Sequence, residues 1–423
     1  MAIDRMVGRS LHGARRGIAV AGLALLVAGC GGGTASPSAS ATGTPTPAPA
    51  AGSTATPTVA PTPVPTPTPT PVAGPWTLGA DSTSLKKIQF YTVIWTGTRF
   101  AAGAILMDGS AVFLDSTDGL TWHLQAASWK NTTIRHIAVG TGGLVAVGDR
   151  AGRMLSWTST DGLAWTLTPD ATSKHPAAGD SLKASGVATW SGGWIAVGEE
   201  DPTCMTGCAP VRAVVWTSAD GAVWTPVAAA PELATAAMQA VTYWQGQYIA
   251  VGRAGKFAAV WTSTDGKVWA RVPDTAAFHA PAGTDQTIGA GMAGVAAGSD
   301  RVVAVGQVFT QGDVGSALAW SQTVGGPWKS ATGDKFLSGQ MFAVSVAPTG
   351  FLAVGPSGSP SCLGGIWSSV DGAIWKCEAS AAAFDGFAPY DAASSPTREI
   401  VVGFGRPGGA MTGAVWTRAL TTP

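Results

Sequence analysis

Charge is scarce in this 423-residue sequence. Asp, Glu, Lys and Arg together make up 12% of the residues, and 25 basic residues balance 25 acidic ones. Composition therefore does not favour nucleic acid as a partner. The five histidines lack the spacing of metal ligands. No glycine-rich stretch follows a strand and opens a helix, as nucleotide-binding motifs do. We expect no nucleic-acid partner, no metal and no cofactor.

Long apolar runs are lacking as well. The one candidate, GIAVAGLALLVAGC at 17–30, is too short for a stable transmembrane helix and follows a segment with four arginines. This pattern predicts an export signal. Its last residues, VAGC, resemble the bacterial lipobox, in which small residues precede a cysteine that becomes diacylated. Residues 1–29 would then be a lipoprotein signal peptide and Cys30 the lipidated N-terminus. The alternative is an ordinary signal peptide with a chance cysteine.

The segment after this cysteine has neither charged nor aromatic side chains. It alternates Pro with Thr over much of 31–74, a composition that cannot bury a core and favours polyproline II. We predict a lipidated, disordered linker over 30–75 and a folded domain over 76–423. The domain would be a monomer held to a membrane through Cys30, outside the cytoplasm, at the cell surface or in the periplasm.

Cysteine is also rare, with four residues besides Cys30. An even number in an exported domain predicts disulfides. Cys204 and Cys208 would close one loop. Cys362 and Cys377 flank a predicted hairpin and would come to lie close to each other. A metal site is the alternative, but no histidine cluster accompanies these cysteines.

Glycine and tryptophan, by contrast, are abundant, with 57 and 18 residues, a balance that favours short strands and many turns. A cassette with two tryptophans around a turn recurs as SWTSTDGLAW, VWTSADGAVW, VWTSTDGKVW, AWSQTVGGPW and IWSSVDGAIW. Between the cassettes, an apolar segment ending in glycine recurs seven times, 45 to 54 residues apart. Such a period indicates a repeat protein.

Each repeat divides into four short strands. In the second repeat we expect them at 134–139, 144–148, 154–159 and 163–168, and the Asp-Gly pair between the last two fits a tight hairpin. Four strands in about 50 residues form one blade of a β-propeller.

The last repeat has Trp416 but neither the Asp-Gly turn nor the second tryptophan of the cassette, and Trp76 at the other end of the domain supplies the missing half. The sequence therefore predicts an all-β, seven-bladed propeller whose last blade is closed by the N-terminal strand around Trp76. The paired tryptophans should pack between blades rather than form a ligand platform.

The cassette resembles the Asp-box of the sialidase-like BNR repeat, Ser-x-Asp-x-Gly-x-Thr-Trp. The segment from Ser116 through Asp118 to Trp122 matches it best, although Gly119 directly follows the aspartate and the motif is one residue short. The copy AWSQTVGGPW lacks the aspartate. The resemblance implies a propeller in which this turn is structural and lies away from any active site.

Sialidases use an arginine triad, a Tyr–Glu pair and an acidic residue, and none of the arginines here has the family's sequence context. We therefore assign no catalytic residue. The favoured function is a binding or scaffold module for a protein or a cell-envelope glycan. The alternative is an exported glycoside hydrolase, similar to sialidases, with a divergent active site.

Candidate binding residues follow from the alternation of propeller turns between two faces. The Asp-Gly turns are uniform, so we place binding on the opposite face, whose connections vary. Six polar residues in these connections are candidates: Glu199, Glu200, Asp201, Arg212, His279 and Asp313. Tryptophans recur at the first hairpin turn of three blades, where the fold does not demand them, and could bind a glycan or protein or merely cap the blade edge. They are Trp95, Trp190 and Trp244.

Overall fold

The structure is a computed structural model, and its contacts divide the chain into two units, Met1–Pro65 and Thr66–Pro423. It describes residues 70–421, apart from 80–84, 169–179, 191, 203–210, 282–286, 311–314, 334–335, 337–338, 360–361, 363, 379–383 and 385. The predicted signal peptide, Cys30 and most of the predicted linker lie outside this part. Within it, no helix has the length and apolar character needed to cross a membrane.

Seven sheets, called blades 1 to 7 in chain order, make up the described part of Thr66–Pro423, and their strands are antiparallel except for one short strand in blade 6. Blade 1 contains β3 (Ile88–Trp95), β4 (Phe100–Leu106), β5 (Ser110–Ser116) and β6 (His123–Lys130). Blade 2 contains β7 (Thr133–Gly140), β8 (Gly143–Arg150), β9 (Arg153–Ser159) and β10 (Thr166–Leu167). Blade 3 contains β11 (Asp180–Trp190), β12 (Gly193–Pro202), β13 (Arg212–Ser218) and β14 (Thr225–Pro226).

The next two blades repeat this order. Blade 4 contains β15 (Ala236–Trp244), β16 (Gln247–Ala254), β17 (Phe257–Ser263) and β18 (Ala270–Arg271). Blade 5 contains β19 (Thr287–Ala297), β20 (Arg301–Thr310), β21 (Ala317–Thr323) and β22 (Lys329–Ser330).

The last two blades contain additional strands. Blade 6 contains β24 (Ala343–Ala347), β25 (Gly350–Val354), β26 (Ile366–Ser369) and β27 (Ile374–Cys377), with β23 (Thr332–Gly333) parallel to β27. Blade 7 contains β28 (Phe387–Ser394), β29 (Arg398–Gly405) and β30 (Thr412–Thr421), and is completed by β1 (Val72–Ala73) and β2 (Thr77–Leu78).

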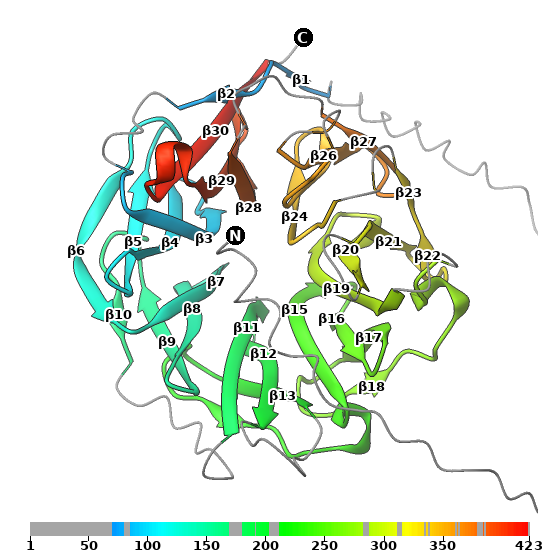
Figure 1. Cartoon of the computed structure of the whole chain (residues 1–423). Helices are drawn as coiled ribbons and strands as arrows, with labels where there is room; N and C mark the ends of the chain where they lie inside the picture. Colours follow the sequence, from blue (N-terminus) through cyan, green and yellow to red (C-terminus); the bar gives the residue numbers. More distant parts are fainter. Residues whose placement is uncertain are drawn as a thin grey trace, which may run out of the picture. The chain divides into compact units, whose positions relative to one another are not determined.

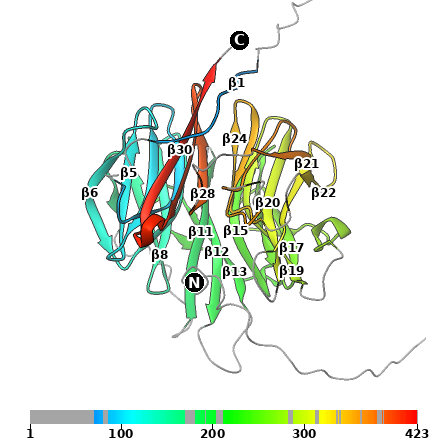
Figure 2. The same cartoon turned by 45° about the horizontal axis from the view of Figure 1, so that its top comes forward.

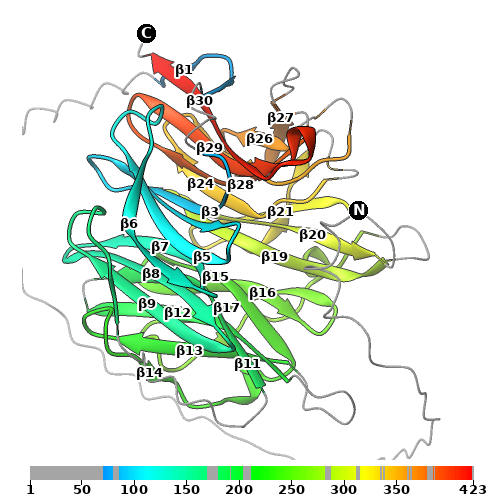
Figure 3. The ribbon, with the colours of Figure 1, turned by 60° about the vertical axis from the view of Figure 1, so that its left-hand side comes forward.

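The first strand of each blade is innermost, and the seven innermost strands surround a common axis (Figure 1). Each of them contacts the innermost strand of the next blade, and β28 of blade 7 contacts β3 of blade 1, which closes the circle. Neighbouring blades pack face to face, as β7, β8 and β9 do against β11 (Figure 3). The predicted seven-bladed propeller is confirmed.

Two N-terminal segments close the last blade. Leu78 pairs with Trp416 and Val72 with Thr421, so both β1 and β2 lie along β30 (Figure 1), and Figure 2 shows β1 beside the end of β30. The predicted closure around Trp76 is confirmed, and strand pairing begins at Val72, four positions before the boundary that we expected from composition. The proline-rich composition hides this strand, because pairing at a sheet edge tolerates proline nearby.

A buried ion pair reinforces the closure. Arg418 Nε donates to Glu399 Oε2 at 2.5 Å, and both residues are buried. The Arg418 guanidinium also lies 4.6 Å from the ring centroid of Trp76, within the range of cation–π attraction. Trp76, which was expected to close the propeller, therefore packs against a guanidinium group that an ion pair holds inside blade 7.

The Asp-Gly turns have one geometry in five blades. In blade 4, the Ser263 hydroxyl accepts the Gly266 N–H at 2.9 Å, and Asp265 Oδ1 accepts the Lys267 and Val268 N–H groups at 2.8 Å. These backbone donors hold the pKa of Asp265 below its usual range. Gly266 has φ +71°, which explains the glycine that directly follows the aspartate.

The same glycine contacts the preceding blade. A Cβ at Gly266 would lie 2.1 Å from Ile195 of blade 3, and one at Gly221 would lie 2.2 Å from Val145 of blade 2. At Gly325, in the copy that lacks the aspartate, an added Cβ would meet no described atom within 4 Å. The turn therefore connects the last two strands of a blade and also packs against the preceding blade.

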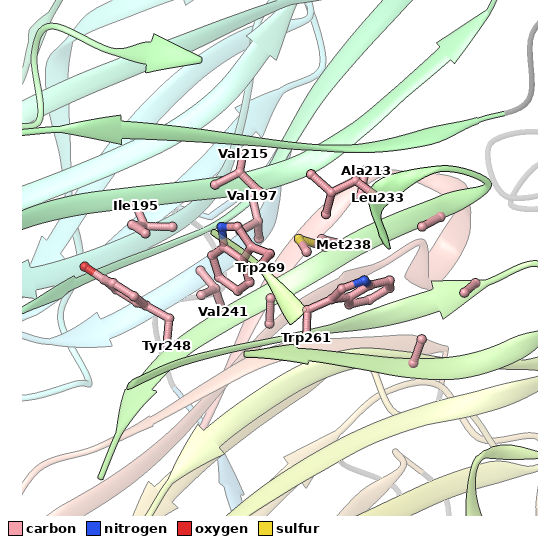
Figure 4. Close-up of a cluster of buried hydrophobic side chains, with 14 of the residues drawn as sticks. Ile195, Val197, Ala213, Val215, Leu233, Met238, Val241, Tyr248, Trp261 and Trp269 are labelled. Atoms are coloured by element: carbon pink, nitrogen blue, oxygen red, sulfur yellow. The ribbon is translucent and has the colours of Figure 1, made fainter. Parts of the chain in front are cut away.

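The paired tryptophans are core residues, as predicted. Trp261 and Trp269 lie in one cluster with Val197 of blade 3 and Met238 of blade 4 (Figure 4). The indole N–H of Trp269 donates to the carbonyl of Gly266 at 3.0 Å. Because each pair fills the space between two blades, its regular recurrence reflects packing.

The predicted Cys362–Cys377 disulfide is present. Its route differs from a simple bridge across the hairpin, because Cys377 pairs in register with Trp367 and Cys362 lies before β26. The bond therefore ties β27 to the connection that precedes β26. Cys204 and Cys208 lie outside the described residues.

Candidate functional site

The innermost strands share an irregularity that sequence analysis did not predict. In six blades the register between the first and second strands shifts by one residue, as between Met238 and Ala240 in blade 4. Such a shift is a β-bulge, which leaves one residue unpaired and redirects its side chain. In blade 4 that residue is Gln239.

The recurrent glycine of the second strand has its explanation here. Gly252 lies opposite Met238, the residue before the bulge, and a Cβ on it would lie 1.9 Å from the carbonyl oxygen of Ala237. The corresponding distances are 1.8 Å at Gly148 and at Gly198. The backbone of the bulged strand therefore approaches too closely for a side chain, except in blade 1, where Ala104 takes this place.

We call the bulged residues the axial set, because they lie on the strands around the axis. In blade 6, Phe342 directly precedes β24 and holds the corresponding place, since Gly355 approaches the Gln340 carbonyl in the same way, at 2.1 Å. All seven are half-exposed. The axial set consists of Tyr91, Arg135, Ser185, Gln239, Ala293, Phe342 and Tyr390.

Aromatic members of the axial set meet across three consecutive blades. The ring centroids of Tyr390 and Phe342 are 5.2 Å apart, and those of Tyr390 and Tyr91 are 5.6 Å apart. The ring centroid of Phe404, in β29, lies 4.8 Å from that of Tyr390. Side chains at equivalent positions of blades 6, 7 and 1 thus form one aromatic arc.

Polar members continue the circle from blade 1 into blade 2. Gln89 Nε2 donates to the Tyr91 hydroxyl at 2.8 Å, and Arg135 forms an ion pair with Asp149 of β8. Burial raises the pKa of the Tyr91 hydroxyl, and the charges of Arg135 and Asp149 act on it in opposite directions. The Tyr91 hydroxyl, the Arg135 guanidinium and the Asp149 carboxylate therefore lie close enough to interact electrostatically.

Ionisable side chains also follow the bulge in two blades. Asp391 Oδ2 accepts the N–H of Val93 in blade 1 at 2.9 Å, and its Oδ1 accepts the N–H of Ala392 at 2.8 Å. Burial raises the pKa of Asp391 to about 6, against the lowering effect of these N–H donors. Burial likewise lowers the pKa of His136 to about 4. Asp391 thus bonds to the innermost strand of blade 1. His136 interacts in the same way with the Val187 backbone, in the innermost strand of blade 3.

The chain matches the DUF6242 beta propeller domain over residues 66–292, which is just over half of its length. The chain belongs to this family. The match begins at the linker and ends in β19 of blade 5. No curated protein sequence matches the chain.

Solved structures with a similar fold include several propellers. YCF48 bound to D1 peptide is 14% identical, with a TM-score of 0.47, over 84% of this chain and 100% of that one. The SapL1 lectin in complex with α-methyl fucoside is 14% identical, with a TM-score of 0.40, over 79% and 97%. Trypanosoma rangeli sialidase in complex with sialic acid is 14% identical, with a TM-score of 0.43, over 79% and 54%. None of these TM-scores reaches 0.5, so the family assignment comes from the match over residues 66–292.

The acidic candidates of this DUF6242 propeller lie in a strand, because β12 continues to Pro202 where we expected a connection. Glu199 is buried and accepts a charged hydrogen bond from Lys183 Nζ at 2.8 Å; Asp201 lies 3.9 Å from the same nitrogen. Glu200 is buried and forms an ion pair with Arg212 of β13. Each carboxylate thus has a cation in its own blade, which is the arrangement of structural ion pairs.

The remaining polar candidates lie apart from this group. His279 is exposed, stacks on Phe257 at 4.1 Å and lies 2.9 Å from Asp274 Oδ2. Asp313 is outside the described residues. Across the part of the chain that the structure describes, no group of three or more His, Cys, Asp or Glu side chains could hold a metal ion.

The candidate tryptophans lie at the first hairpin turns, as expected, and the two whose side chains are described differ in exposure. Trp244 is buried, and its indole N–H donates to the Gly298 carbonyl of blade 5 at 3.0 Å. Trp95 is half-buried, and its ring centroid lies 4.7 Å from that of Phe100. Trp190 ends β11, and its side chain is outside the described part. The indole of Trp244 therefore joins two blades, which corresponds to the capping alternative.

Proposed function

We propose that this DUF6242 chain is an exported lipoprotein, anchored through Cys30, whose propeller binds a protein or cell-envelope glycan at the axial set. The leader and the proline-rich linker support export and tethering. The variation of the axial set supports binding. One backbone bulge carries Tyr, Arg, Ser, Gln, Ala, Phe and Tyr in successive blades, whereas a requirement of the fold alone would favour one residue type throughout.

The bulge gives these side chains a feature common to ligand sites. Each is half-exposed and lies in an innermost strand or, for Phe342, directly before one, and in blades 1, 3, 4 and 5 both chain neighbours are buried. Groups held on packed strands keep a defined geometry at little entropic cost when a ligand binds. Apolar aromatic surface next to a few fixed polar groups is the usual composition of such sites.

The anchor is tested with Cys30→Ser in the full chain. In cells given a radioactive fatty acid, the unaltered chain should become labelled and sediment with membranes, and the variant should be unlabelled and released. Cys362→Ser is the matched control, because its cysteine lies in the propeller. Equal labelling of the Cys30→Ser variant and the unaltered chain would contradict lipidation at Cys30.

Binding is tested with purified full-length Cys30→Ser protein and washed cell-envelope fragments. Tyr390→Ala and Arg135→Ala should each lower the retained fraction at least tenfold. Val268→Ala is the control, since Val268 is exposed in the Asp-Gly turn of blade 4, on the face opposite to the connections that we expected to vary. Retention that is equal in all four proteins, or zero in all of them, would rule out the axial set as the binding site.

One observation favours the hydrolase alternative. Asp391 adjoins Tyr390 and has its pKa raised to about 6, a range typical of catalytic acids. Both of its oxygens already accept backbone N–H groups, which favours a structural role. Release of 4-methylumbelliferone from a panel of glycosides, lost in Asp391→Asn but kept in Val268→Ala, would establish hydrolysis over binding alone.

A further inference from the structure

We infer that the axial set binds a neutral sugar ring, and this inference rests on the proposed binding function. The sugar's C–H face would lie on the aromatic arc, and its hydroxyls would bond to the polar members in blades 1 to 4. The observation behind this is that aromatic and polar members occupy separate, adjoining parts of the same circle.

The aromatic arc presents rings that are not stacked in parallel. Tyr390 meets Phe404, Phe342 and Tyr91 at interplanar angles of 34°, 57° and 76°. In the core between blades 1 and 2, by contrast, Phe113 and Trp165 stack at 4.0 Å and 5°. Because these rings are tilted rather than stacked in parallel, they do not fully cover one another's faces, and aromatic faces attract weakly polarised C–H groups.

The two tyrosine hydroxyls of the arc are neutral at physiological pH. Because Gln89 donates to the Tyr91 oxygen, the hydrogen of that hydroxyl is directed to another acceptor. Burial, together with Tyr91, raises the pKa of Tyr390 to about 12, so this hydroxyl also keeps its proton at physiological pH. Both tyrosines can therefore donate to ligand oxygens while their rings contact apolar C–H groups.

Charge balance separates neutral from acidic sugars. Arg135 is the one cation of the axial set, and Asp149 already pairs with it. The pair offers donors and an acceptor side by side, which suits two neighbouring hydroxyls, each of which both donates and accepts. A sugar carboxylate would have to displace Asp149 or lie beside it, at an electrostatic cost.

A polypeptide would need several residues to engage these groups. An apolar side chain would contact the aromatic arc, and the partners of the Arg135–Asp149 pair and of the Gln239 amide would have to come from its backbone or from another side chain. A sugar ring carries both an apolar face and hydroxyls, so one ligand engages both parts of the axial set.

The test is isothermal titration of full-length Cys30→Ser protein with methyl glycosides of glucose, galactose, mannose and N-acetylglucosamine. Glucuronic acid, N-acetylneuraminic acid and peptides released from the envelope by protease serve as the other ligands. At least one neutral glycoside should bind. Tyr390→Ala should weaken it at least tenfold, and Tyr390→Phe, which keeps the ring and loses the hydroxyl, about threefold.

A second variant tests the inference even if the Tyr390 variants fail to fold. Asp149→Asn should weaken the neutral glycoside and strengthen an acidic sugar, because Arg135 loses its anionic partner. Val268→Ala should bind as the unaltered protein does, and circular dichroism should show unchanged melting for each variant used. Binding of peptides or acidic sugars but of no neutral glycoside would overturn the inference and leave the binding function standing. Envelope retention that no axial substitution changes would overturn both.

Discussion

The Asp-Gly turns and the axial bulges recur at equivalent places in the blades, yet they differ in how their side chains vary. Five turns keep Ser, Asp and Gly in the same positions, with the same hydrogen bonds around the aspartate. The bulges keep their backbone geometry, while their side chains range from alanine to tyrosine. The turn positions keep the same residues because they make the same contacts in each of these blades.

The two regions also treat carboxylates in opposite ways. Backbone N–H groups lower the pKa of Asp265 in its turn, and burial raises the pKa of Asp391 beside the axial set to about 6. An exposed carboxylate that caps a turn is stabilised by its donors, whereas a buried one pays for desolvation. The carboxylates of the turns therefore stabilise the folded chain, whereas burial makes ionisation of Asp391 costly.

The largest effect is expected where the bulge backbone leaves no room. Gly252→Val should lower the free energy of unfolding by about 3 kcal/mol or more, because its side chain would overlap the Ala237 carbonyl. Urea unfolding would measure it, with Gly142→Val as control, since an added Cβ there meets no described atom within 4 Å. Equal losses in both variants would show that the bulge backbone is adaptable.

The pH dependence of stability should differ between the two regions. Because the folded-state pKa of Asp391 lies above its unfolded value, its contribution is fully present below pH 4 and is lost as the pH rises through about 6. Asp391→Asn should remove up to about 3 kcal/mol of this dependence. Urea midpoints at pH 4 and pH 7 would measure it, and parallel curves for variant and unaltered protein would refute it.

The repeated turn should affect stability and leave binding alone. Asp265→Ala should lower the free energy of unfolding by about 1 kcal/mol, because two backbone N–H groups lose their acceptor. Its envelope binding should be unchanged when measured as for Tyr390→Ala. Weaker binding without a loss of stability would show that the Asp-Gly face takes part in function.

The axial set should show the reverse pattern. Gln239→Ala should change the free energy of unfolding by less than about 0.5 kcal/mol, since its half-exposed side chain is not in the described core. The affinity for a neutral glycoside should fall about threefold or more. Titration calorimetry and urea unfolding on the same preparation would separate these outcomes, and a stability loss above about 1 kcal/mol would make the position structural.

The smallest effect concerns the turn of blade 5. Val324 is exposed and stands where the other cassettes have aspartate. Val324→Asp should change the free energy of unfolding by less than about 0.5 kcal/mol, because the Gly326 N–H already donates to the Thr323 carbonyl and Pro327 has no N–H to offer. An unchanged melting temperature would support this, and a clear rise would show that the blade 5 turn can adopt the geometry of the other five.

Much of the fold could be predicted, because it depends on local patterns repeated many times. Trp416 without its partner and Trp76 without a preceding repeat indicated the closure, and the Asp-Gly pair indicated a turn with positive φ. The fourth strand of blade 2 was expected at 163–168 but is only Thr166–Leu167, because the aspartate-centred turn uses the residues before it. The extra pairing at Val72 was missed, since two residues of strand give no periodic signal.

The site was predicted less well, for physical reasons. Glu199 and Glu200 were expected in a variable connection, but the strand extends past them and pairs each with a cation. Trp244 was a candidate for binding, yet it packs between two blades. The axial residues went unassigned, although the repeated glycine was a usable signal, because in every blade but the first it marks a close approach of the neighbouring strand.

The sequence by itself determined the number of blades, the way the circle closes and the residues that fill the spaces between blades. These follow from periodic hydrophobicity and from turn chemistry, which act over a few residues. Only the tertiary structure decided that Phe342, Tyr390, Tyr91 and Arg135 belong together. They are far apart in the chain, and they meet because equivalent positions on the innermost strands of neighbouring blades, or in Phe342 just before one, lie side by side around a common axis.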